Sequence, residues 1–206
     1  LPHEKAEIPK ADMGEPESEK PVKSYNEEQM EVSAPQFLIG AKVTPAPDGD
    51  ALLRQRIVAQ LALRTVFGTS AAFYNRLYAD GTLNRDYDYE IDYTAGTATI
   101  MLGGESASPQ KVLGEISSEL EHVFTGGIDA AAFEAARRAS FGSRLRGLED
   151  FDNLCLALAD GVFGGYCALD AYEVLESIEK RECEAFLKAF MTPDKLAMSV
   201  INPVKA

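Results

Sequence analysis

Apolar residues alternate with polar or small residues in several stretches of the chain, a pattern that predicts strands. One predicted strand covers residues 36–43. Residues 88–104 predict two further strands joined by a turn at Ala95 and Gly96. A last strand is expected over residues 196–202, where Pro203 ends it.

Between these strands, apolar residues recur at helical spacing. The predicted helices cover about residues 50–67, 71–80, 108–126, 129–147, 150–163, 170–177 and 180–190. Long helices kept apart from an antiparallel hairpin are typical of the α+β class. We therefore expect an antiparallel sheet with helices packed on one of its faces.

Residues 1–33 differ in composition from the rest of the chain. They hold nine acidic residues and four prolines, and Tyr25 is their only aromatic residue. Such a segment buries too little apolar area to offset the entropy of ordering it. We interpret it as an acidic linker or tail, with a short helical turn over residues 24–31, and we assign residues 34–206 to a single α+β domain.

The charge of the chain excludes some classes of partner. It has 20 Lys and Arg against 33 Asp and Glu, a formal charge of -13, so nucleic acid is not expected as a partner. No apolar run reaches the length of a membrane span, no signal peptide is visible, and three cysteines give no disulfide framework. These features predict a cytoplasmic protein without a membrane partner.

No catalytic or metal-binding motif is visible in the chain. Its two histidines, His3 and His122, lie far apart, and neither belongs to an H-x-x-E-H or H-E-x-x-H motif. Cys155 and Cys167 lie in or beside apolar helical segments, which favours buried small hydrophobic residues over nucleophiles. We therefore predict no catalytic residue, no metal ligand and no cofactor in this chain.

The most unusual local feature is a strand in which acidic residues alternate with tyrosines, within residues 86–93. One interpretation is a strand that lines a polypeptide-binding cleft. The other is an outward polar strand face with tyrosine hydroxyls at its boundary. Under the first interpretation, the candidate substrate-contacting residues are Arg85, Tyr87 and Tyr89.

Two long segments carry a resemblance to a known family. They are SAAFYNRLYADGTLNRDYDYEIDYTAGTATIMLGGESASPQKVLGEISSEL and GGIDAAAFEAARRASFGSRLRGLEDF, flanked by SAPQFLIGAKV and MTPDKLAMSVINP. Together they resemble the C-terminal, non-catalytic domain of pitrilysin/insulinase-family metallopeptidases, of the bacterial two-subunit zinc protease type. The resemblance covers residues 34–204 and rests on the overall arrangement of these segments, not on one sharp motif.

The resemblance implies a concrete function. In this family, zinc binds an inverted H-x-x-E-H motif in the N-terminal domain, and homologous domains close around a peptide. The implied partners are the chain's own N-terminal catalytic domain, a homologous subunit and a peptide substrate, with zinc held outside this chain. This chain would form the wall of the peptide chamber, where its negative charge would concentrate basic peptides.

One part of the family pattern is missing here. Some family members have, in this domain, an Arg followed seven residues later by a Tyr that holds substrate. In this chain, Arg76 is followed at that spacing by Leu83, and Arg85 by Asp92. No substrate-clamping pair is therefore carried over.

Two other functions stay open at this point. A scaffold or assembly module could keep the peptidase fold without peptidase activity, because a fold does not fix a function. An independent enzyme using Cys167 or the acidic tyrosine strand is the third hypothesis, and no motif in the sequence supports it.

Overall fold

The computed structural model describes residues 18–94 and 96–204. The strands in this part of the chain are β1 (Tyr25–Met30), β2 (Gln36–Val43), β3 (Asp88–Thr94), β4 (Thr97–Glu105) and β5 (Ala197–Pro203). The helices are α1 (Asp50–Phe67), α2 (Ala72–Ala79), α3 (Pro109–Gly126), α4 (Ala130–Gly147), α5 (Phe151–Gly164), η1 (Ala168–Asp170), α6 (Ala171–Ser177) and α7 (Lys180–Phe190).

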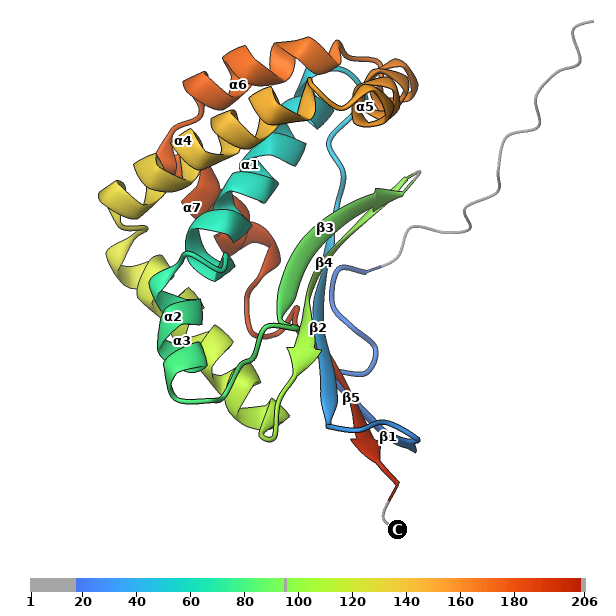
Figure 1. Ribbon diagram of the computed structural model, residues 1–206, viewed down its shortest axis with the longest axis vertical. Helices are drawn as coiled ribbons and strands as arrows, with labels where there is room; N and C mark the ends of the chain where they lie inside the picture. Colours follow the sequence, from blue (N-terminus) through green and yellow to red (C-terminus); the bar gives the residue numbers. More distant parts are fainter. Residues whose placement is uncertain (1–17, 95, 205–206) are drawn as a thin grey trace, which may run out of the picture.

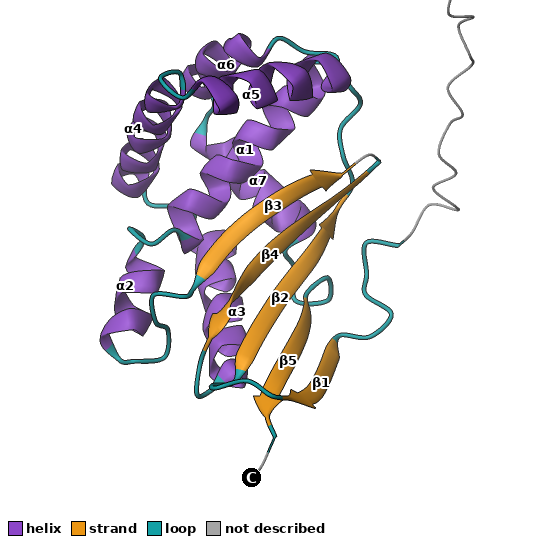
Figure 2. Cartoon of the chain, turned by 45° about the vertical axis from the view of Figure 1, so that its right-hand side comes forward, coloured by secondary structure: helices purple, strands orange, loops and turns teal. Residues whose placement is uncertain are grey.

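The five strands form one sheet in the order β1-β5-β2-β4-β3 (Figure 2). β2 lies at its centre and is antiparallel to both β4 and β5. The predicted hairpin is confirmed, because β3 pairs with β4 in antiparallel register from Asp88 opposite Gly103 to Thr94 opposite Thr97. β1 differs from the expected antiparallel arrangement, since it runs parallel to β5.

One face of the sheet forms the floor of the core. The residues that point to this face are buried in the three middle strands: Phe37, Ile39, Ala41 and Val43 of β2, Ala98, Ile100 and Leu102 of β4, and Met198 and Val200 of β5. The helices gather on this side and leave the other face open (Figures 1 and 2). The predicted α+β class, with helices on one face of the sheet, is confirmed.

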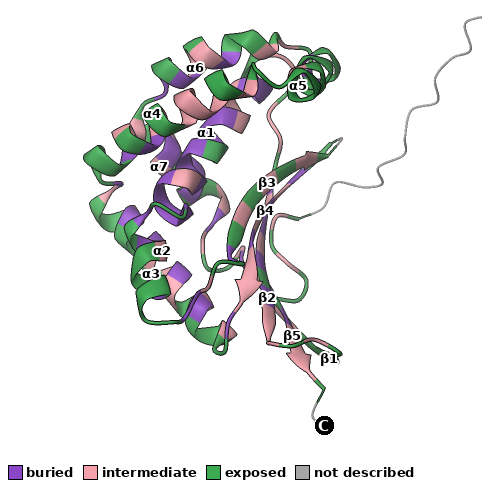
Figure 3. Cartoon of the chain, in the orientation of Figure 1, coloured by how far each residue is buried: buried purple, intermediate pink, exposed green. Residues whose placement is uncertain are grey.

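α1 is the central helix of the layer that covers the sheet. It packs against α2, α4, α6, α7 and β3, and Leu61 and Phe67 are almost completely buried within it. Figure 3 shows α1 largely in the colour of buried residues. A helix that is apolar on most of its sides is stable only where other elements cover those sides. Burial of each large apolar side chain then contributes roughly 1.5–3 kcal/mol to the stability of the fold.

The structure corrects the prediction for residues 24–31. They form β1, not a helical turn, and most of its side chains are exposed. The strand is held instead by main-chain pairing with β5 from Tyr25 opposite Met198 to Met30 opposite Pro203. The sheet thus begins within the predicted linker. Residues 1–17 of that linker lie outside the described part of the chain. The assignment of residues 34–206 to a single domain stays a prediction.

α5 lies at one end of the helical layer, near the turn end of the β3–β4 hairpin (Figure 1). No single described helix combines the length and the apolar composition needed to cross a membrane. Phe151–Gly164 and Ala168–Ser177 meet both criteria only when taken together, and they are bent by 104° relative to each other.

Candidate functional site

A cavity of about 540 Å³ lies where β3 faces α1 and α4. Its walls are formed by residues 88–91 of β3, by Gln60 and Arg64 of α1, and by Ser140, Ser143 and Arg144 of α4. This volume is within the range of roughly 300–1,000 Å³ that is typical of ligand sites. The cavity therefore has the size to hold a few residues of a peptide.

β3 contributes a free edge to this cavity. The strand is the last in the sheet order and pairs only with β4 among the described strands. An unpaired edge presents main-chain N–H and C=O groups that another extended chain can pair with. The wall of the cavity formed by β3 is thus suited to main-chain hydrogen bonding with a peptide.

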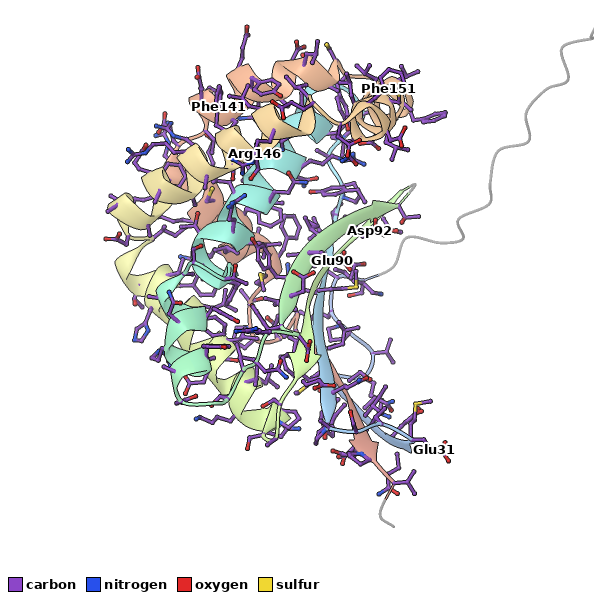
Figure 4. The ribbon with its side chains drawn as sticks, viewed as in Figure 1. Glu31, Glu90, Asp92, Phe141, Arg146 and Phe151 are labelled. Carbon is purple, nitrogen blue, oxygen red and sulfur yellow. The ribbon has the colours of Figure 1, made fainter. Side chains whose placement is uncertain are left out.

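The predicted alternation along β3 is confirmed. Tyr89, Ile91 and Tyr93 are half-buried against the helices, whereas Asp88, Glu90 and Asp92 are exposed. Figure 4 shows Glu90 and Asp92 along the strand. Exposed charges on an edge strand also limit unspecific pairing between copies of a sheet, so the acidic residues have a structural role whether or not a ligand binds.

Two arginines give the cavity a positive side. Arg144 donates a hydrogen bond from Nη2 to Oε1 of Gln60 at 2.8 Å, and its burial lowers the pKa of its guanidinium. Arg64 also lines the cavity, and its charge opposes the rise that burial causes in the pKa of the Tyr89 hydroxyl. Neither arginine forms an ion pair with a carboxylate of the described residues.

The three predicted substrate-contacting residues occupy different environments. Tyr89 lines the cavity, and Arg85 is exposed in the loop before β3, outside the cavity lining. Their role in substrate contact stays a prediction.

The side chain of Tyr87 is buried and cannot be reached by a substrate. Its side chain is 3% exposed, its hydroxyl donates to the main-chain oxygen of Phe67 at 3.1 Å, and its ring stacks on Tyr74. Tyr87 is thus a core residue, and the prediction that it contacts substrate is wrong. Arg64 and Arg144 were missed, because nothing in the sequence brings α1 and α4 together beside β3.

The cavity does not fit a zinc ion. Two arginines and no histidine or cysteine line it, and zinc needs three or four convergent nitrogen, sulfur or carboxylate ligands. No group of three or more such side chains in residues 18–94 and 96–204 is arranged to hold a metal ion. His122 is exposed on α3, and His3 lies outside the described residues.

The cysteines also differ from the prediction. Cys155 and Cys167 are exposed, not buried, because α5 and the segment after it lie at the surface. Cys183 is buried on α7, where burial raises the pKa of its thiol to about 12. A thiol with so high a pKa is a poor nucleophile.

A second surface lies on α5. Its exposed apolar side chains, which we call the α5 surface, are Phe151, Leu156, Leu158, Val162 and Phe163. Phe163 is 86% and Val162 79% exposed, and Figure 3 shows the helix mostly in the colour of exposed residues. Several large exposed apolar side chains on one helix are typical of surfaces that contact another protein.

Comparisons with known proteins give this geometry a context. No protein-family model matches the chain. A protein named zinc protease YmfH from Bacillus subtilis (strain 168) is 26% identical over 188 residues, which are 91% of this chain and 44% of YmfH. The chain thus spans less than half the length of this relative.

Solved structures share the fold. A protein described as an M16-like peptidase from Alicyclobacillus acidocaldarius superposes with a TM-score of 0.86 and 24% identity, over 91% of this chain and 45% of that one. A structure described as the inactive peptidase domain of a zinc protease from Bordetella parapertussis superposes with a TM-score of 0.71 and 12% identity, over 86% of this chain and 95% of that one.

The chain is therefore a domain with the M16-like peptidase fold. The resemblance to a zinc metallopeptidase domain is confirmed at the level of sequence similarity and fold, because the chain is similar to a zinc protease and shares its fold with M16-like peptidase structures, one of them a domain described as inactive.

Proposed function

We propose that this chain is the non-catalytic C-terminal domain of a zinc metallopeptidase of the pitrilysin/insulinase type, and that it forms one wall of a peptide-binding chamber. Its similarity to a zinc protease and the fold it shares with a domain described as inactive support this proposal. Proteolysis then requires an H-x-x-E-H-bearing domain, which also holds the zinc ion.

The observation that carries the proposal is the free edge of β3 along the cavity. An extended peptide can add to the sheet beside β3, with main-chain hydrogen bonds supplying affinity and alternate side chains supplying specificity. Tyr89 and Ile91 lie on the side of β3 that faces the cavity. Alternate side chains of the added peptide would point to the same side.

The α5 surface is the proposed contact with the rest of the protein. The Bacillus relative is more than twice as long as the matched region, which leaves room for a second domain of similar size that the α5 surface would contact. We assign this contact to the N-terminal catalytic domain and expect a homologous subunit to complete the chamber. The three cysteines are unpaired, as is usual in the cytoplasm, where we place the protein.

The first test uses the purified chain alone. We expect less than about one tenth of a zinc ion per chain after dialysis, because zinc requires several convergent ligands, and no hydrolysis of an unstructured peptide. About one tightly held zinc ion per chain, or hydrolysis that a chelator abolishes, would show that the chain has a catalytic site and would overturn the proposal.

The second test uses a longer protein that includes this chain and the zinc-binding domain. Tyr89→Ala removes a side chain from the cavity on edge strand β3, and Tyr25→Ala is its matched control on β1, the opposite edge strand. We expect Tyr89→Ala to raise KM several-fold with little change in kcat or zinc content, because uniform binding is lost. Equal effects of the two substitutions would contradict a chamber wall at β3.

The scaffold alternative makes a different prediction for the same protein. A module that only assembles with partners needs the α5 surface but not a peptide at β3. Binding of a partner without any binding of unstructured peptides would favour this alternative.

A further inference from the structure

The two arginines of the cavity differ from most others in the chain. Arg54, Arg56, Arg76, Arg137 and Arg181 each form an ion pair with a carboxylate. Arg64 and Arg144 form none with the described residues, although the chain has an excess of 13 negative charges. Carboxylates are thus abundant, yet none is placed against these two guanidinium groups.

The acidic residues that line the cavity do not neutralise the arginines. Asp88 and Glu90 belong to the exposed row of β3, and Oδ1 of Asp88 accepts a hydrogen bond from the main-chain nitrogen of Tyr89 at 2.8 Å. Both carboxylates therefore lie at the rim of the cavity. Its inner wall, formed by α1 and α4, stays positively charged.

The positions of the arginines in their helices explain only part of this arrangement. Each lies in the last turn of its helix, where the helix dipole favours a positive charge. The last carbonyls of a helix can accept hydrogen bonds from a guanidinium, but neither arginine donates to such a carbonyl among the described residues. Arg144 donates to Gln60, and Arg64 donates no hydrogen bond to the described residues.

Taking Arg144 partly out of water has a free-energy cost, which its lowered pKa reflects. An anion in the cavity would offset that cost, because hydrogen bonds between a guanidinium and a carboxylate are short, charge-assisted and often bidentate. The hydroxyls of Ser140 and Ser143 line the same wall and are further potential donors to an anion.

We propose that Arg64 and Arg144 form a carboxylate-binding subsite, which selects peptides that carry a carboxylate in the segment bound beside β3. This inference rests on the proposed function, since it names the substrate class for the same cavity. The negative surface of the chain attracts basic peptides at a distance, whereas the subsite recognises one negative group within them. The carboxylate comes either from a Glu or Asp side chain or from the C-terminus of the peptide.

Calorimetric titration of the chain with three unlabelled, unstructured peptides of about ten residues tests the inference. The first is neutral and amidated, the second carries one Glu at its centre and is amidated, and the third is neutral with a free C-terminal carboxylate. We expect the Glu peptide or the free-carboxylate peptide to bind roughly tenfold or more tightly than the neutral one. The peptide that gains affinity identifies the source of the carboxylate.

Two variants locate the effect. Arg64→Gln combined with Arg144→Gln removes both charges from the cavity, and Arg138→Gln removes an exposed charge of α4 that does not line the cavity. We expect the double variant to bind all three peptides within about twofold of one another, because the charge-assisted hydrogen bonds are lost. The Arg138→Gln variant keeps the preference of the native chain.

The outcomes separate this inference from the function on which it rests. Equal affinities of the native chain for all three peptides would overturn the carboxylate subsite and leave peptide binding at β3 intact. A preference that survives in the double variant would also overturn it. If no peptide binds at all, the proposed chamber wall fails together with the subsite.

Discussion

α1 and α5 are both apolar helices, but they have opposite environments. α1 packs against four other helices and β3, and most of its apolar side chains are buried. α5 contributes only Gly161 and Gly164 to the buried set, although it is rich in Leu, Val, Ala and Phe. Apolar composition thus predicts that a surface is covered, but not whether this domain or another molecule covers it.

Polar contacts help to hold α5 in place, since few of its apolar side chains are packed. Arg56 of α1 pairs with Asp160 and donates to the hydroxyl of Tyr166 at 2.9 Å. Tyr166 in turn donates to Asp160 at 2.7 Å. A Cβ atom at Gly161 would lie only 2.8 Å from the main-chain oxygen of Tyr166, so glycine is required for this close approach. The α5 surface is therefore presented in a defined orientation.

The largest expected effect is on the stability of the fold, which should depend strongly on the buried side chains of α1. Phe67→Ala removes a fully buried ring that lies edge-to-face on Phe73 with centroids 5.3 Å apart. We expect the free energy of unfolding to fall by about 3–5 kcal/mol. Urea denaturation followed by circular dichroism measures the change, and a loss below about 1 kcal/mol would contradict the central place of α1 in the core.

A second difference concerns the thiols. Cys155 of α5 is exposed, whereas Cys183 packs under α1, with its Sγ 3.7 Å from the main-chain oxygen of Val58. At mildly alkaline pH, we expect Cys155 and Cys167 to react with a thiol reagent at least about a hundredfold faster than Cys183, which needs local or global opening. Comparable rates for all three thiols would place α7 outside the core.

A smaller effect comes from the ion pair that joins α1 to α7. Arg54 donates to both carboxylate oxygens of Glu182 at 2.8 Å, and these hydrogen bonds lower the pKa of Glu182 from its ordinary value of 4.5. We expect Glu182→Gln to cost up to about 1 kcal/mol at neutral pH through loss of the ion pair, because the side-chain oxygen of Gln can still accept from Glu179 in the capping box of α7.

The pH dependence of this effect has a definite sign. Because the pKa of Glu182 is lower in the folded chain, its ionised carboxylate stabilises the fold at pH values above the ordinary pKa of 4.5. This stabilisation is lost as the pH falls below 4.5 and through the folded-state pKa. The difference in stability between native and Glu182→Gln chains should therefore shrink on acidification. A difference that grew as the pH fell would contradict the ion pair.

The smallest expected effect is on α5 itself. Phe163→Ser replaces a side chain that is 86% exposed, so the stability of the isolated chain should change by less than about 0.5 kcal/mol. In a longer protein with the catalytic domain, the same substitution should weaken the contact between the two domains, as measured by limited proteolysis of the linker. Loss of stability in the isolated chain would show that Phe163 packs within this domain.

Much of the fold could be predicted from the chain because its strands and helices carry strong periodicities. β1 could not, since YNEEQM has no apolar alternation and is held by main-chain pairing with a strand more than 160 residues away, as in Tyr25 opposite Met198. Tyr89 was found from its alternation within β3. Arg64 and Arg144 were not, because only tertiary packing brings α1 and α4 to the same cavity.

The central claim is that the edge of β3, and not the α5 surface, binds an extended peptide. Hydrogen–deuterium exchange of the chain with and without a saturating unstructured peptide tests it most directly. We expect the amides of Asp88–Thr94 that are not bonded to β4 to exchange at least about tenfold more slowly with peptide, because the free edge becomes paired, while those of Phe151–Gly164 do not change. Protection of α5 without protection of β3 would contradict the account.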